Sequence, residues 1–453
     1  MVIIGGGATG VGIAVDAASR GYSTLLLEQS DFGKGTSSRS TKLIHGGVRY
    51  LQQGNLPLVM EALRERRRLQ ANAPHLVHLL PFVVPAYRWW EVPYYGAGLK
   101  LYSLLALERS HILSRRETLE RLPGANANGL RGGILYFDGQ FDDARLLIHL
   151  ALTAIEQGAV LLNYAQVTEA SKSGVRFRDV ETGEEHTAQA RIVINAAGPF
   201  SDAVRRLADP SADPVLAPSQ GIHIVLDRGF LPGETALLVP RTPDGRVMFA
   251  IPWLGHTLIG TTETPVTQAP LEPTAFEPEI AFLLEVSGRY LAKRPTRGDI
   301  RSVFAGIRPL VGSGGQSSAE VSRDHVIRVE PSGLLTIAGG KWTTYRRMAE
   351  DCVDRAAGIA GLPHRPCVTR DLPIHRWTEE QPAVLRAVRD EMARTVEDVL
   401  ARRTRALFLD ARSAVAQAPE VARVLAREQG RDSAWETAQV AAFEELARGY
   451  LPA

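Results

Sequence analysis

VIIGGGATGVGIAVDAASRGYSTLLLE, residues 2–28, is the stretch that decides the fold. Residues 2–4 are apolar and end in Gly5, residues 9–20 carry apolar side chains at helical spacing, and residues 22–27 form a second apolar run. A strand, a helix and a strand in this order make the βαβ unit of a nucleotide-binding half, with parallel strands and a right-handed crossover. The stretch therefore predicts an α/β domain of the Rossmann-like class.

Three glycines of this stretch, Gly5, Gly7 and Gly10, have the GxGxxG spacing of a dinucleotide-binding loop. The first permits a tight turn, the second lets the backbone approach a pyrophosphate, and the third admits close packing of helix on strand. Glu28, which closes the second apolar run, is placed to accept hydrogen bonds from a ribose, which disfavours the 2′-phosphate of NADP. FAD and NAD share this fingerprint, so the loop by itself leaves the choice between them open. A glycine-rich structural turn is the alternative interpretation.

Length and composition limit the remaining classes. The chain has 453 residues, 45% of them hydrophobic and 23% charged, as expected of a soluble globular protein with two or three domains. Its formal charge of +2 offers no case for nucleic-acid binding. The only cysteines, Cys352 and Cys367, lack metal-ligand spacing, so we predict neither a metal site nor a disulfide framework. No run approaches the roughly 18 apolar residues of a spanning helix, and no basic, cleavable leader precedes the first strand, so we expect a cytoplasmic protein.

The order of patterns along the chain predicts interleaved domains and a helical tail. Helical periodicity and apolar runs between 142 and 197 predict that the nucleotide-binding sheet is interrupted and then resumed, with strands at 160–164, 175–180 and 192–197. Short apolar runs between Pro and Gly turns over 214–328 predict an antiparallel sheet. We assign 1–75, 142–205 and 331–362 to the nucleotide-binding domain, 76–141 and 206–330 to a substrate domain, and 363–453 to a C-terminal helical domain.

The segment GTSSRSTKLIHGGVRY, residues 35–50, closely resembles the FAD-dependent glycerol-3-phosphate dehydrogenases of the D-amino-acid-oxidase-like flavoprotein superfamily. Further motifs follow in the family's order: FDDARL (141–146), NAAGP (195–199), GIHIV (221–225), GIRPL (306–310), SRDH (322–325) and GGKWTTYR (339–346). The resemblance extends to the tail at 391–403. It implies FAD as the cofactor, a Rossmann-like FAD-binding domain with an antiparallel-sheet substrate domain and a C-terminal helical domain, and oxidation of sn-glycerol 3-phosphate to dihydroxyacetone phosphate.

The resemblance also implies which residues form the site. The cofactor contacts would be Gly5, Gly7, Ala8, Thr9, Gly10, Glu28, Gln29, Thr36, Ser37, Ser38, Lys42, Leu43, Ile44, His45, Gly46, Gly47, Val167, Ala197, Gly198, Gly340, Lys341, Trp342 and Thr343. The substrate contacts would be Arg49, Tyr50, His223, Arg308, Arg323 and Lys341, with His223 and Arg308 as catalytic residues.

The chemistry of the reaction supports two of these roles. A phosphate dianion needs basic side chains, and Arg binds it bidentately, so we expect Arg308 with Arg323 as the main clamp and Lys341 in support. A surface ion pair is the alternative interpretation for any single Arg. Oxidation of a secondary alcohol needs a base for the hydroxyl proton while hydride leaves for the flavin. His223 is the candidate, against a strand histidine satisfied by backbone, and His45 is the rival base.

The electron acceptor and the partners stay open at this stage. A quinone fits a dehydrogenase, whereas dioxygen fits a glycerol-3-phosphate oxidase that releases hydrogen peroxide; a D-amino-acid-oxidase-like amine oxidoreductase and a flavin-carrying interaction module without activity are further alternatives. Aromatic residues over 89–102 form an interfacial belt or pack in the core. Bacterial relatives attach to membranes, so we expect peripheral attachment at the inner face of the cell membrane and a quinone acceptor. A homodimer is a further open alternative.

Overall fold

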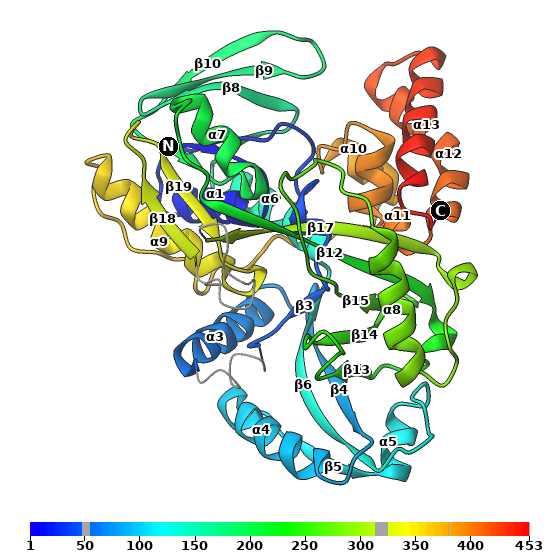
Figure 1. The fold of residues 1–453 in the computed structure, drawn as a ribbon. Helices are drawn as coiled ribbons and strands as arrows, with labels where there is room; N and C mark the ends of the chain where they lie inside the picture. Colours follow the sequence, from blue (N-terminus) through cyan, green and yellow to red (C-terminus); the bar gives the residue numbers. More distant parts are fainter. Residues whose placement is uncertain (48–54, 313–324, 379, 453) are drawn as a thin grey trace.

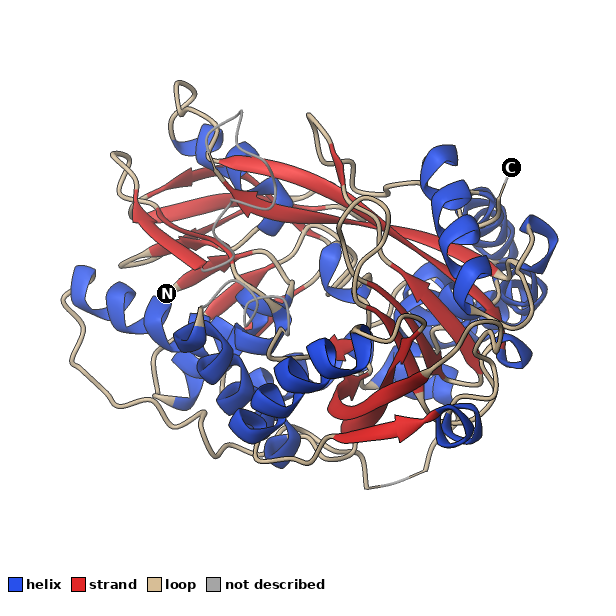
Figure 2. Ribbon diagram, turned by 60° about the horizontal axis from the view of Figure 1, so that its bottom comes forward, coloured by secondary structure: helices blue, strands red, loops and turns tan. Residues whose placement is uncertain are grey.

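The computed structural model describes residues 1–47, 55–312, 325–378 and 380–452. The molecule contains a parallel sheet with helices, a long antiparallel sheet and a group of C-terminal helices that lies at one side (Figure 1). Coloured by secondary structure, the helices lie around the outside of the central strands (Figure 2). The predicted α/β class with an antiparallel second sheet and a helical C-terminal region is confirmed.

The first sheet carries the glycine-rich loop. Its strand order is β18 (His325–Val329), β19 (Leu335–Gly339), β11 (Val193–Asn195), β1 (Val2–Ile4), β2 (Leu25–Leu27) and β7 (Val160–Leu162). All neighbours pair in parallel except β18 with β19. Strand β2 is shorter than the predicted strand at 22–27. Strand β18 belongs to this sheet, whereas the sequence analysis placed residues up to 330 in the substrate domain.

Both faces of this sheet are covered, which explains the continuous apolar runs of its strands. Helices α1 (Ala8–Ser19), α6 (Asp143–Glu156) and α9 (Tyr345–Ile359) share a core with Ile3, Leu26 and Ile194. The alternate residues Val2 and Ile4 face the opposite side. There they pack against α7 (Ser201–Ala208) and a small sheet of β8 (Ala165–Ser171), β9 (Gly174–Asp179) and β10 (Glu185–Gln189).

The placement of β9 corrects the sequence prediction, which assigned residues 175–180 to the resumed nucleotide-binding sheet. Val175 and Phe177 are buried whereas Arg176 and Arg178 are exposed. This alternation is typical of an antiparallel strand with one solvated face, and β9 pairs antiparallel with both β8 and β10.

The second sheet is long and mostly antiparallel. Its order is β16 (Thr264–Pro265), β12 (Leu216–Asp227), β15 (His256–Gly260), β14 (Met248–Trp253), β13 (Ala236–Val239), β4 (Val77–Ala86), β6 (Gly132–Phe141) and β3 (Leu43–Ile44), with β17 (Ser302–Val311) paired to β12 and β5 (His111–Ser114) to β6. Only β13 and β4 pair in parallel within it. Strand β3 is the strand that follows β2 of the first sheet along the chain, and it pairs with β6 at one edge of the second sheet. Residues 28–42 therefore connect the two sheets.

Helices cover both faces of the second sheet. One face packs against α5 (Arg115–Arg121) and α8 (Glu277–Tyr290). The other packs against α3 (Leu56–Asn72), α4 (Glu91–Ala106), α10 (Ala383–Arg389), a π-helix at Asp398–Arg403, α11 (Ala406–Leu409), α12 (Ala411–Gln429) and α13 (Ser433–Arg448). The C-terminal helices therefore share one apolar core with the sheet. Among the helices of the described residues, none combines the length and apolar character needed to cross a membrane.

Candidate functional site

The glycine-rich loop joins β1 to α1 in a geometry that side chains would block. Gly5 has φ +110°, and a Cβ there would lie 2.6 Å from the Ala196 carbonyl oxygen. A Cβ on Gly10 would collide with the Gly5 carbonyl oxygen, so this glycine sets the close contact of helix and strand. Gly7 is the residue before α1 and lines the cavity described below. The loop thus brings backbone and the positive end of α1 to that cavity.

Glu28 holds the loop from the end of β2. Its carboxylate accepts hydrogen bonds from the backbone N–H groups of Gly6 (2.6 Å) and Ser30 (2.9 Å). Burial raises the pKa of Glu28, while these two N–H groups lower it. Because two carboxylate oxygens offer about four acceptor positions, the same group that orders the loop can also receive a ribose hydroxyl.

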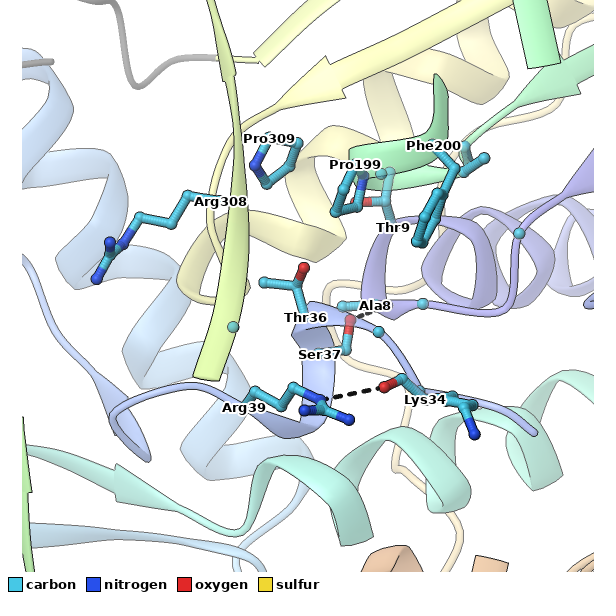
Figure 3. Close-up of a pocket in the computed structure, with 18 of the residues that line it drawn as sticks. Ala8, Thr9, Lys34, Thr36, Ser37, Arg39, Pro199, Phe200, Arg308 and Pro309 are labelled. Atoms are coloured by element: carbon cyan, nitrogen blue, oxygen red, sulfur yellow. Dashed lines mark hydrogen bonds between the residues drawn. The ribbon is translucent and has the colours of Figure 1, made fainter. Parts of the chain in front are cut away.

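The loop opens onto a cavity of about 560 Å³, a size typical of ligand and cofactor pockets. Its wall comes from segments far apart in the sequence: residues 4–9, 27–29, 33–45, 165–167, 196–207, 306–310 and 339–343 each contribute. The backbone N–H of Ala8 donates a hydrogen bond to Ser37 Oγ (2.9 Å). Figure 3 shows this contact, with Arg308 at one side of the view and Phe200 at the other. The cavity lies where the carboxyl ends of β1, β2 and β11 meet the long sheet, the usual place for a ligand in such folds.

Most predicted site residues line this one cavity. They are Gly5, Gly7, Ala8, Thr9, Glu28, Gln29, Thr36, Ser37, Leu43, His45, Val167, Ala197, Gly198, His223, Arg308, Gly340, Lys341, Trp342 and Thr343. Two hydrogen bonds join the distant segments: Trp342 Nε1 donates to the Ser37 carbonyl oxygen (2.8 Å) and Thr343 Oγ1 donates to that of His45 (3.4 Å). The substrate residues predicted at Arg49, Tyr50 and Arg323 lie outside the described residues.

Five predicted cofactor contacts lie behind the cavity wall instead: Gly10, Ser38, Lys42, Ile44 and Gly46; Gly47 lines a neighbouring cavity. Gly46 donates its N–H to the Tyr102 hydroxyl (2.9 Å).

Lys42 is the clearest correction among them. Its side chain is fully buried, and Nζ donates to both carboxylate oxygens of Asp143 (2.8 Å) and to the Ser38 carbonyl oxygen (2.8 Å). The backbone at Lys42 is left-handed, with φ +62°. The side chain therefore ties η1 (Thr36–Ser38) to the start of α6 and is not part of the cavity wall.

The sequence missed several wall residues, among them Lys34, Arg39, Pro199 and Phe200. Lys34 and Arg39 lie on either side of Thr36–Ser38, and both form ion pairs with carboxylates. Lys34 Nζ pairs with Glu397 (2.6 Å), and Arg39 Nη2 pairs with Glu272 (2.7 Å). Pro199 belongs to the NAAGP motif, which was the signal that could have found it.

A second cavity of about 220 Å³ adjoins the first. Thr41, Leu43, His45 and Arg308 line both cavities. The remaining wall is aromatic and aliphatic, from Phe82, Tyr136, Leu238, Pro240, Val247 and Phe249, with Gly47, Thr261 and Thr262 and the ionisable Asp138, Arg246 and Glu263. A small polar molecule at the junction would thus be close to both an Arg and the larger cavity.

His223 lies in β12 in the wall of the larger cavity and is 2% exposed. Its ring stacks on Phe304 of the neighbouring strand β17, with centroids 5.0 Å apart and an interplanar angle of 20°. Nε2 is 2.9 Å from Thr41 Oγ1. Burial lowers the pKa of His223 well below its ordinary value, and the charges of Lys42 and Arg308 lower it further. These effects favour the neutral imidazole, in which one ring nitrogen is unprotonated and can accept a hydrogen bond.

Arg308 lies on β17, and its side chain extends over the paired strand β12. Its guanidinium donates to the Thr262 carbonyl oxygen (3.1 Å), the Gln220 carbonyl oxygen (3.4 Å) and Thr261 Oγ1 (3.0 Å). These three oxygens orient the guanidinium within the cavity wall. The positive charge therefore lies at the junction of the two cavities.

The residues present fit a dinucleotide: a loop in which added Cβ atoms would collide, a carboxylate at the end of the second strand, and a cavity that runs on to a histidine and an arginine. Residues 1–346 match the family model described as FAD dependent oxidoreductase, and residues 370–436 match the C-terminal domain of alpha-glycerophosphate oxidase.

Several glycerol-3-phosphate dehydrogenases are similar to this chain. A mitochondrial glycerol-3-phosphate dehydrogenase of Arabidopsis thaliana is 46% identical over 83% of this chain and 63% of its own length, and a probable one of Caenorhabditis elegans is 39% identical over 100% and 73%. The chain spans about three fifths of the length of the first of these relatives. The glycerol-3-phosphate dehydrogenase of Bacillus halodurans, solved with FAD, has a TM-score of 0.80 and 29% identity, covering 100% of this chain and 95% of that one. An L-alpha-glycerophosphate oxidase of Mycoplasma pneumoniae shares the fold (TM-score 0.64, 19% identity, covering 83% of this chain and 98% of that one).

Proposed function

Because this chain belongs to the family of FAD-dependent oxidoreductases, with FAD as its cofactor, we propose that it oxidises sn-glycerol 3-phosphate to dihydroxyacetone phosphate. The observation that carries the proposal is that the buried, neutral His223 and Arg308 line the same cavity, and that Arg308 also lines the smaller cavity beside it. The names of the most similar relatives support the same substrate.

Each residue has a stated task in this reaction. Arg308 binds the phosphate dianion, and its anchoring to carbonyl oxygens directs the guanidinium toward the junction. His223 receives the proton of the secondary hydroxyl as general base. FAD, when bound, accepts the hydride from the same carbon. Lys341, at the end of β19 and in the cavity wall, adds positive charge near the cofactor. Arg49, Tyr50 and Arg323 remain proposed substrate contacts.

We propose a quinone as the electron acceptor and a membrane surface as the place where it is met. Large apolar side chains are exposed on and beside α4: Trp89 (80%), Tyr94 (60%), Leu104 (69%), Leu107 (77%) and Ile112 (64%). Ile112 of β5 approaches Gly96 of α4, so the two elements form one surface, at the end of the molecule away from β8–β10 (Figure 1). Exposed aromatic and aliphatic side chains of this kind suit the interface of a bilayer.

Anaerobic titration of the FAD-loaded protein with sn-glycerol 3-phosphate tests the reaction. We expect the yellow flavin to bleach with glycerol 3-phosphate and not with D-amino acids; the opposite result would replace the proposal by an amine oxidoreductase. Aerobic turnover then separates the acceptors, since stoichiometric hydrogen peroxide would identify an oxidase, whereas reduction of a quinone analogue without peroxide supports the dehydrogenase.

Sedimentation with anionic phospholipid vesicles tests the surface. Leu104→Ser with Leu107→Ser should abolish binding and leave reduction by glycerol 3-phosphate unchanged. Ile359→Ser, at the 47% exposed end of α9, is the matched control and should bind like the parent protein. Equal binding by all three proteins would reject the α4 surface.

A further inference from the structure

We propose that Thr41 carries the proton between the substrate hydroxyl and His223, so that the base of this site is a Thr–His pair. The inference rests on the proposed oxidation of an alcohol. Thr41 lies in the segment 35–50, between the predicted cofactor contacts Ser38 and Lys42, and the sequence analysis gave it no role.

The first observation is the bonding of the imidazole. His223 Nε2 lies 2.9 Å from Thr41 Oγ1, a contact between residues 182 positions apart. Nδ1 is buried and has no hydrogen-bond partner among the described residues. Thr41 is thus the group through which the described part of the chain connects the imidazole to a proton donor or acceptor.

The second observation is the position of the hydroxyl. Thr41 lines both cavities, whereas His223 lines the larger one and is absent from the wall of the smaller. The smaller cavity also contains Arg308, the proposed phosphate ligand. A substrate held there presents its hydroxyl to Thr41 before it can reach the ring.

The third observation is that the imidazole is packed closely between neighbouring strands. Phe304 stacks against one face of His223, and on β15 a Cβ added to Gly260 would lie 2.7 Å from Nε2 and 2.9 Å from Cγ. The imidazole fills the space that the missing side chain of Gly260 leaves. Since close packing holds the ring in place, Thr41 is the residue that links the smaller cavity to the imidazole.

Thr41 is itself held rigidly from both sides. Ser40 donates its N–H (3.0 Å) and its hydroxyl (2.7 Å) to Asp143 Oδ2, and Lys42 Nζ donates to the same carboxylate (2.8 Å). The Lys42 N–H also donates to Ser40 Oγ (3.0 Å). Both neighbours of Thr41 are therefore anchored on the buried Asp143, and the Thr41 hydroxyl faces the imidazole.

The proton transfer balances in one concerted step. The substrate O–H bond breaks and its proton goes to Thr41 Oγ1, while the proton of Thr41 goes to His223 Nε2. The substrate oxygen becomes a carbonyl oxygen because its carbon loses a hydride, which FAD would accept when bound. Two charged groups face the imidazole, Lys42 from the residues after η1 and Arg308 from β17, and both favour the neutral ring that the step needs at its start.

Single-turnover reduction of the FAD-loaded protein tests the pair. Thr41→Val keeps the shape and removes the hydroxyl, so we expect flavin reduction to slow by about 10²- to 10³-fold, within the range of general acid–base catalysis. Thr41→Ser should recover most of the rate. The double variant with His223→Asn should be no slower than His223→Asn alone, because both residues serve one transfer. FAD content and the Kd of glycerol 2-phosphate, a probe that has the phosphate but no secondary hydroxyl, should stay within about threefold.

A second readout does not depend on turnover. ¹⁵N NMR of histidine-labelled protein should show His223 Nε2 as an unprotonated acceptor of a hydrogen bond, and Thr41→Val should shift that signal; Thr187→Val, on the exposed strand β10, should not. Reduction of Thr41→Val at the parental rate, multiplicative slowing in the double variant, or a protonated Nε2 in the parent protein would each overturn the proposal. If glycerol 3-phosphate fails to reduce the parent flavin, the proposed function fails, whereas the NMR result still decides whether Thr41 donates to His223.

Discussion

Replacement of Lys42 by methionine separates two assignments of this residue, a cofactor ligand according to the sequence and a buried partner of Asp143 according to the structure. In the folded chain, Nζ donates to both oxygens of Asp143 and to one carbonyl oxygen, and neither charged side chain is exposed. Burial lowers the pKa of Lys42 and raises the pKa of Asp143, and each charge opposes the shift of the other. Methionine removes the cation and leaves the carboxylate buried.

Loss of one partner from a buried ion pair costs about 3 to 5 kcal/mol, because the remaining charge is uncompensated. Asp143 keeps the N–H groups of Ser40 and Ala144 and the Ser40 hydroxyl as donors, which places the expected cost toward the lower end of that range. With a urea m-value of roughly 3 kcal/mol per M or more for a long chain, the midpoint of unfolding falls by about 1 M. Lys42→Met with Asp143→Asn should be more stable than Lys42→Met alone, since a neutral amide keeps an acceptor and carries no charge.

Urea denaturation of the apoprotein followed by circular dichroism measures this change without the stabilisation that bound FAD adds. Lys293→Met removes the lysine of an exposed pair with Asp299 (3.7 Å) and serves as the control, with an expected cost below about 1 kcal/mol. FAD titration of the apoprotein completes the test. An unchanged midpoint together with a tenfold weaker Kd for FAD would refute the structural assignment and return Lys42 to the cofactor.

Three further predictions concern other contacts. Arg403→Met removes two hydrogen bonds to the buried Asp31 (2.5 and 2.9 Å), so the free energy of unfolding of the apoprotein, measured in urea, should fall by about 2 to 3 kcal/mol. Gly260→Ala forces the imidazole out of its place, and stopped-flow flavin reduction should slow by about 10²-fold at unchanged FAD content. Burial and the charge of Arg145 lower the pKa of His149 to about 3, so below pH 6.5 the unfolded chain binds a proton that the folded chain does not. Stability should therefore decrease as pH falls from about 6.5 toward 3, by at most about 4 to 5 kcal/mol, and urea midpoints of His149→Gln should decrease less over that window.

Each of these predictions has a control and a result that contradicts it. Arg423→Met breaks an exposed pair with Glu420, and equal midpoints for this variant and Arg403→Met would show that the buried contact contributes nothing. Gly229→Ala adds a Cβ with no atom within 4 Å, and equal flavin reduction in both glycine variants would remove the steric argument. For His149, a pH profile of the Gln variant that parallels the parent protein would assign the slope to other groups.

The local patterns predicted the elements around the glycine loop closely. Helix α1 begins one residue before the predicted start, α6 lies where helical periodicity was predicted to return at 142, and most expected wall residues share one cavity. These succeed because apolar periodicity and glycine spacing depend on neighbours in sequence. Strand β9 was assigned to the wrong sheet because a short apolar run does not reveal its partner strand.

The sequence by itself determined the dinucleotide loop, the two kinds of sheet and the order of the motifs, since each follows from residues close together in the chain. Tertiary structure alone decided where side chains point. Lys42 has a left-handed backbone and a buried side chain that pairs with Asp143, and the absence of a side chain on Gly260 leaves room for His223 beside Thr41. Both contacts join residues 101 or 182 positions apart, and pairing over such distances is set by packing and by the need of buried polar groups for partners.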